Sequence, residues 1–111
     1  MKRSIVIFFS AINFALIGCS GSLPHPMESH VLTIAKKFPS ITLPHLEEGR
    51  VLYIQKCSGC HTLRLPSEFS EEKWMSIIQE MKAEAKLEES ESQKVLQYII
   101  AIKESETTLQ K

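Results

Sequence analysis

Two cysteines and a histidine carry the clearest chemical signal in this sequence of 111 residues. Cys57, Cys60 and His61 form the pattern C-x-x-C-H, and Ser58 and Gly59 between the cysteines are small enough for a tight loop. Two thiols at this spacing can bond to the two vinyl groups of one haem, and a histidine directly after them can bind the iron. The pattern therefore predicts one covalent haem c on Cys57 and Cys60, with His61 as an axial ligand of its iron.

Two other interpretations of a C-x-x-C pair fit this sequence poorly. A zinc ribbon needs a second pair of Cys or His ligands, but the only other cysteine is Cys19, in the apolar leader. A thioredoxin-like redox site needs the pair at the start of a helix within a β-α-β unit, and no strand pattern precedes Cys57. We therefore expect haem attachment at this pair.

The first 18 residues have the features of a secretory signal. Lys2 and Arg3 precede an apolar run from Ile5 to Ile17, which is followed by small residues. This run is shorter than the roughly 20 apolar residues that a membrane-spanning helix needs. We therefore expect an exported protein, and an uncleaved membrane anchor is the alternative.

The end of this leader, Leu16-Ile17-Gly18-Cys19, resembles the lipobox of bacterial lipoproteins. The resemblance implies that Cys19 becomes the first mature residue and carries lipid, and several acyl chains anchor a protein stably. The expected location is therefore the periplasmic side of a bacterial membrane. Ser20 is not the acidic retention residue known from some lipoproteins, which favours the outer membrane. The alternative is an ordinary signal cleaved near a cysteine.

Composition divides the chain into three segments. Residues 1–18 form the signal peptide, and residues 19–41, rich in Ser, Pro and His, are expected to be a lipidated tether with one short helical turn around residues 30–37. Residues 42–106 are expected to form the folded domain. A domain of this size usually needs reinforcement beyond its hydrophobic core, and a covalent haem would supply it.

The segment from residue 42 onward shows helical periodicity and no strand alternation, so the expected fold class is all-α, with about three helices around the haem. The first helix begins near Thr42 and enters the cysteine motif. The second begins after Ser70 as its N-cap and ends near Lys86. One apolar stripe along the second helix consists of Trp74, Ile77, Ile78, Met81 and Ala85.

The third helix is expected over residues 89–104. Its apolar residues are spread widely around the helix axis, which predicts burial on more than one side. They are Val95, Leu96, Ile99, Ile100 and Ile102.

The surroundings of the motif resemble the class I, mono-haem cytochromes c. Gly49 lies eight residues and Tyr53 four residues before Cys57, and the sequence around Tyr98 is similar to the C-terminal pattern of that family. The resemblance covers residues 42–104. It implies that Gly49 lets the last helix cross closely, with Tyr98 packed beside the crossing. The proline, tryptophan and methionine that closely follow the motif resemble those of a compact bacterial subset, here of the lipoprotein type.

That resemblance implies a methionine sulfur as the sixth ligand of the iron. Met81 is our choice, because it shares the apolar face of the second helix with Trp74, which is expected to pack against the haem. Met75 lies off the centre of that stripe and is expected to fill the core. Met27 lies in the expected tether.

Two points stay open at this stage. The histidines that precede the motif would give bis-histidine ligation instead, and the last of them is the most credible: His25, His30 and His45. Pro66 also has two interpretations. The resemblance implies that its carbonyl accepts a hydrogen bond from the ring of His61 beside the haem, whereas a simple turn before Ser67 explains it equally well.

The expected function is electron transfer by a lipid-anchored carrier, whose partners are redox proteins and a membrane. Such a carrier needs no catalytic residues. The alternatives are a haem enzyme or a haem-based small-molecule sensor with an open or displaceable sixth position, and Arg64 is the only acid-base candidate near the motif. Nucleic acid is excluded as a partner, because the formal net charge is zero and no aromatic residues interleave with the scattered basic ones.

Overall fold

The computed structural model describes residues 23–57 and 63–111. Within these ranges the chain is all-helical and contains no strand, which confirms the expected class. The predicted signal peptide, Cys19, Cys60 and His61 lie outside the described residues. Among the helices that are described, none is long and apolar enough to cross a membrane. The elements are α1 (Glu28–Ile34), α2 (Leu43–Cys57), the 3-10 helix η1 (Pro66–Glu68), α3 (Glu71–Glu84) and α4 (Glu89–Leu109).

Short polar side chains begin two of these helices, as the sequence predicts. At the start of α3, the Ser70 hydroxyl accepts a hydrogen bond from the backbone N–H of Lys73 at 3.2 Å. At the start of α2, the Thr42 hydroxyl accepts one from the N–H of His45 at 3.4 Å. α4 continues five residues beyond its predicted end at Glu104.

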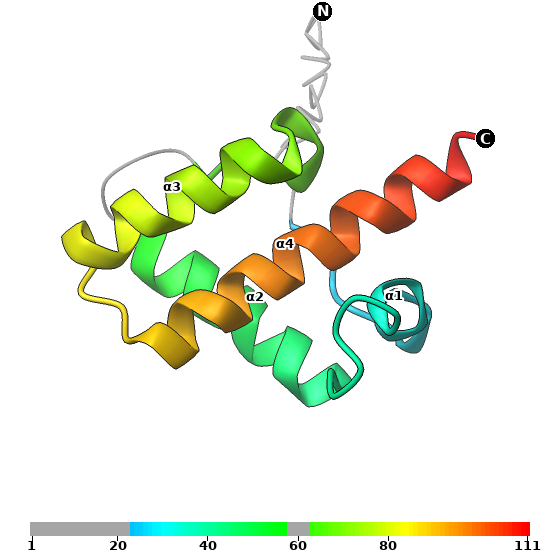
Figure 1. Cartoon of the computed structure of the whole chain (residues 1–111), viewed down its shortest axis with the longest axis horizontal. Coiled ribbons are helices and arrows are strands. Elements are labelled where there is room, and N and C mark those ends of the chain that lie inside the picture. The colour runs from blue at the N-terminus through cyan, green and yellow to red at the C-terminus, as the bar shows by residue number, and fades with distance from the viewer. Residues whose placement is uncertain (1–22, 58–62) are drawn as a thin grey trace, which may run out of the picture.

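The last helix, α4, is the centre of the fold, because α1, α2 and α3 all pack against it. Figure 1 shows α3 and α1 on opposite sides of α4. Two hydrophobic cores result, which confirms the predicted burial on more than one side. The closed core consists of Ile34, Ile41, Leu46, Ile100 and Ala101. The cavity core consists of Leu23, Tyr53, Cys57, Trp74, Ile78, Val95, Tyr98, Ile99 and Ile102.

The crossing of α2 and α4 depends on Gly49. A Cβ atom at this position would lie 2.1 Å from the carbonyl oxygen of Lys94 and 3.0 Å from Cβ of Tyr98. The contact with the Lys94 oxygen is too short for any side chain, and the one with Tyr98 is tight, so only glycine permits this approach of the two helices. Tyr98 is fully buried beside the crossing. The roles implied for Gly49 and Tyr98 by the resemblance are therefore confirmed.

The segment before α2 is packed on the helices from Leu23 onward. Leu23 is buried, and its carbonyl accepts hydrogen bonds from the Arg50 guanidinium at 3.1 and 3.3 Å. The Tyr98 hydroxyl donates to the carbonyl of Pro24 at 2.7 Å, and α1 buries Ile34 completely against α4. The packed part of the chain therefore begins before the predicted boundary at residue 42. The few apolar residues of this polar segment pack into the two cores on α4.

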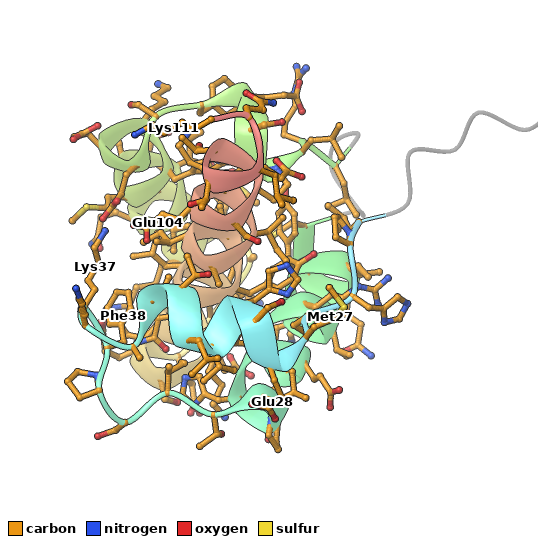
Figure 2. The ribbon with its side chains drawn as sticks, turned by 90° about the vertical axis from the view of Figure 1, so that its right-hand side faces the viewer. Met27, Glu28, Lys37, Phe38, Glu104 and Lys111 are labelled. Carbon is orange, nitrogen blue, oxygen red and sulfur yellow. The ribbon has the colours of Figure 1, made fainter. Side chains whose placement is uncertain are left out.

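A lysine after α1 joins this segment to the rest of the fold. The Lys37 ammonium lies 2.7 Å from a carboxylate oxygen of Glu104 and 2.8 Å from one of Glu71. Figure 2 shows Lys37 beside Glu104 at the edge of the molecule. Hydrogen bonds to both carboxylates raise the pKa of Lys37, and the bond to Glu104 has the larger effect. Because the three groups are substantially exposed, their contribution to stability is small.

Candidate functional site

A pocket of about 400 Å³ opens in the cavity core. Its lining comes from the end of α2, from α3 and from the segment between them. Its volume lies within the range of pockets that bind small molecules and cofactors, roughly 300–1,000 Å³. Most of the lining is apolar or aromatic, and one described side chain in it carries a charge. The described lining residues are Tyr53, Cys57, Leu63, Arg64, Phe69, Trp74, Ile77, Ile78 and Met81.

The buried face of α2 brings Cys57 to this pocket. The buried residues of the helix recur at helical spacing along one side: Leu46, Gly49, Tyr53 and Cys57. Cys57 is the last residue of α2 and is 7% exposed. The first cysteine of the motif therefore forms part of the pocket wall, where it can bond to a cofactor held inside.

The apolar stripe of α3 supplies a facing wall. Trp74, Ile77, Ile78 and Met81 all line the pocket, as their spacing predicts. The structure thus places the thioether of Met81 and the sulfur of Cys57 on the same cavity. Trp74, expected to pack against the haem, lines the same pocket and is buried in the cavity core.

The other described methionines lie away from this pocket. Met75 is 53% exposed and Met27 is 58% exposed. The prediction that Met75 fills the core is wrong, because its position on α3 turns its side chain away from α2 and α4. Met81 is therefore the described methionine that the fold brings to the pocket.

The described histidines do not line the pocket either. The His45 ring nitrogen Nε2 lies 2.6 Å from Oε1 of Gln97. Cys57 follows His45 by twelve positions in α2, which corresponds to about 18 Å along the helix. His30 is buried in α1, where its Nδ1 accepts a hydrogen bond from the backbone N–H of Met27 at 2.7 Å. Burial lowers the pKa of His30, and the opposing effect of the nearby Glu106 is smaller. The geometry favours Met81 over these histidines.

Two aromatic side chains bind the main chain that follows the motif. The Tyr53 hydroxyl donates to the carbonyl of Arg64 at 2.7 Å and accepts from the N–H of the same residue at 3.1 Å. The indole N–H of Trp74 donates to the carbonyl of Pro66 at 2.9 Å. The two rings meet edge to face, with centroids 6.2 Å apart. Burial raises the pKa of Tyr53 to about 12, so its hydroxyl keeps its proton at neutral pH.

These contacts add to what the sequence suggested. The Pro66 carbonyl was expected to accept a hydrogen bond from His61, which lies outside the described residues; in the structure its described donor is Trp74. The sequence identified Tyr53 only as the aromatic residue four positions before Cys57 and did not predict its hydrogen bonds. The available signal was its chemistry, because a buried tyrosine hydroxyl usually finds a partner.

The residues present fit a haem. The apolar and aromatic lining suits a flat porphyrin, Cys57 can form a thioether, and Met81 offers a soft sulfur ligand for iron. The Arg64 guanidinium also lies at the pocket, where it is 3.4 Å from a carboxylate oxygen of Glu68. The lining can therefore hold the apolar ring of the cofactor.

Comparison with known proteins agrees with this assignment. The dihaem cytochrome c family matches residues 53–110, just over half of the chain, and the match includes the cysteine motif, α3 and α4. No match was found among curated proteins or among solved structures. The family description names two haems, which differs from the expected resemblance to mono-haem class I cytochromes. The chain is a c-type cytochrome that belongs to the dihaem cytochrome c family.

Proposed function

We propose that this chain carries one covalent haem on Cys57 and Cys60, with His61 and Met81 as axial ligands, and that it transfers electrons. The observation that supports the proposal best is the shared pocket of Cys57 and Met81, which come from different helices. When bound, the haem supplies an iron that exchanges one electron between its ferric and ferrous forms.

The side chains around the pocket set the conditions for that exchange. A thioether ligand such as Met81 favours ferrous iron and raises the reduction potential. An apolar wall such as Trp74 and Ile78 excludes water and disfavours the additional charge of ferric haem. Both effects favour a carrier of relatively high potential.

The count of motifs supports the proposal of one haem per chain. Each attachment uses a pair of cysteines, and the 111 residues contain one C-x-x-C-H pattern. The third cysteine, Cys19, is assigned to the lipid. We infer that each copy carries a single haem, whereas the family description names two.

The same proposal includes the location and the partners. Lipid on Cys19 would hold the domain at the periplasmic side of a bacterial membrane, where it meets redox proteins. A Cys19→Ser variant should lose incorporated fatty acid and move from the membrane to the soluble fraction. Retention in the membrane without the cysteine would contradict lipid anchoring.

An electron carrier is favoured over a haem enzyme or a sensor, because the structure offers a side chain for the sixth position. The described lining has few polar groups besides Cys57 and Arg64: the Tyr53 hydroxyl is engaged by the Arg64 main chain, and the Trp74 indole N–H by the Pro66 carbonyl. The described pocket therefore offers little acid-base chemistry.

The decisive experiment is spectroscopy of the full chain produced in a haem-maturing host. The haem content should be one per chain, and the oxidised protein should show the charge-transfer band of a methionine bound to ferric iron. Met81→Ala should abolish this band, whereas Met75→Ala, the exposed methionine on the same helix, should retain it. A band that survives in Met81→Ala would exclude this ligand, and carbon monoxide binding by the unmodified reduced protein would favour the sensor or the enzyme.

A further inference from the structure

The segment that was expected to be a tether is held on the helices from its first described residues onward. Leu23 is 5% exposed and belongs to the cavity core. Its carbonyl accepts two hydrogen bonds from the Arg50 guanidinium on α2, at 3.1 and 3.3 Å. The carbonyl of Pro24 accepts one from the Tyr98 hydroxyl on α4, at 2.7 Å. Apolar and polar contacts together therefore fix residues 23 and 24 on two helices.

The residues that follow also lie along the fold. In α1, Ile34 is fully buried in the closed core and His30 is 7% exposed. Beyond α1, the Lys37 ammonium pairs with the carboxylates of Glu71 and Glu104. This packing removes residues 23–38 from the length of chain that could separate the domain from an anchor.

Covalent geometry then limits how far an anchor on Cys19 can lie from the domain. An extended chain spans at most about 3.6 Å per residue. Cys19 precedes the predicted boundary at Thr42 by 23 positions, so a free tether of that length could reach about 80 Å. Cys19 precedes Leu23 by four positions, which limits the reach to about 14 Å whatever their conformation.

We propose that the domain lies directly on the membrane surface, with the face around Leu23 and Met27 toward the lipid. This inference rests on the proposed function, because it requires lipid on Cys19. Met27 is 58% exposed and offers an apolar side chain at this face. Figure 2 shows the start of the described chain on the same side as Met27, and Phe38 at the opposite end of α1.

This placement narrows the choice of redox partners. Leu23 belongs to the cavity core, in which the pocket for the haem opens. The short link therefore keeps the haem near the membrane that holds the lipid. It favours partners that lie at the surface of the same membrane over partners that only a long tether could reach.

The experiment places a nitroxide spin label near either end of α1 in the full lipidated chain with its haem attached. Met27→Cys puts the label on the proposed membrane face, and Lys36→Cys, also at an exposed position, puts it at the opposite end. Haem and lipid occupy the natural cysteines, so each variant offers one free thiol. The probe is a phosphatidylcholine vesicle that contains a nickel-chelating lipid. EPR power saturation, compared with vesicles without nickel, measures how strongly the membrane-bound nickel relaxes each label.

We expect a nickel effect several-fold larger for Met27→Cys than for Lys36→Cys, because α1 lies between the two labels. Equal effects at the two positions in the lipidated protein would overturn the inference.

The matched control lengthens the link and leaves the described contacts in place. An insertion of about 20 Gly and Ser residues between Ser22 and Leu23 adds roughly 25 Å of average reach. The nickel effect on Met27→Cys should then fall to the level of Lys36→Cys, and an unchanged effect would overturn the inference. Mass spectrometry separates the two levels of failure. Absence of lipid from Cys19 overturns the proposed anchoring and this inference with it, whereas lipid on Cys19 with equal nickel effects overturns the inference alone.

Discussion

The two cores on either side of α4 are built differently. The buried members of the closed core are aliphatic, and they come from α1, α2, α4 and the connection between the first two helices. The cavity core contains two tyrosines, a tryptophan and Cys57, and a pocket of about 400 Å³ opens beside them. One helix thus serves two purposes, with stable packing on one face and room for a cofactor on the other.

The chemistry of the residues explains the difference. Aliphatic side chains fill space without needing polar partners, so they suit the closed core. Tyrosine and tryptophan combine a large apolar ring with one hydrogen-bonding group. In the cavity core they can therefore bind main chain at Arg64, Pro66 and Pro24 while their rings pack.

The largest expected effect is at the crossing that both cores share. Gly49→Val would place side-chain atoms where Lys94 main chain already lies, so α2 and α4 must separate and both cores must open. We expect a loss of more than about 4 kcal/mol in the free energy of unfolding, which is exceptional for one substitution. Chemical denaturation followed by circular dichroism measures it. Val51→Ala, at an exposed site on the same helix, should change stability by less than about 1 kcal/mol, and similar losses in the two variants would refute the explanation.

The next test makes the same substitution in each core. Ile34→Ala, in the closed core, should cost about 2–5 kcal/mol of unfolding free energy and leave the reduction potential unchanged. Ile78→Ala should also destabilise the fold, but because Ile78 lines the pocket, it should admit water and lower the potential. Denaturation and voltammetry on the two haem-loaded variants check both parts. A potential shift in Ile34→Ala equal to that in Ile78→Ala would remove the distinction between the cores.

The smallest expected effect concerns pH and the α1 side of the molecule. Burial lowers the pKa of His30 below its ordinary 6.5, against the opposing effect of Glu106. The unfolded chain therefore binds a proton before the folded one as pH falls, and stability present above pH 6.5 is lost as pH drops through the folded pKa. We expect a loss of at most about 1 kcal/mol, the typical net contribution of one hydrogen bond.

The control for this test is His30→Gln. Glutamine at the third position of a helix can accept the same N–H of Met27 without titrating. Urea denaturation between pH 7.5 and 5 should show a smaller decline for this variant than for the unmodified protein. Identical declines would mean that His30 is not the responsible group.

Much of the fold could be predicted from the sequence. The apolar spacing of residues 74–85 and the N-cap at Ser70 predicted α3, and the broad apolar surface of residues 95–102 predicted the burial of α4 on two sides. The packing of residues 23–41 could not be predicted in the same way, because this stretch has little periodicity and a composition typical of linkers. Its burial depends on a complementary face of α4, which local sequence does not reveal.

For the candidate site, neighbouring residues along the chain were enough to indicate the chemistry. The C-x-x-C-H motif predicts haem attachment at Cys57, and the family match to residues 53–110 agrees with it. Which side chains share the pocket depends on how the helices pack, and this packing brings Met81 there and leaves His45 and Met75 outside. It also decided that the Tyr53 hydroxyl binds Arg64, because that contact depends on how the chain turns back after the motif. Motifs are local in sequence, whereas pockets and hydrogen bonds between distant segments form only when helices pack.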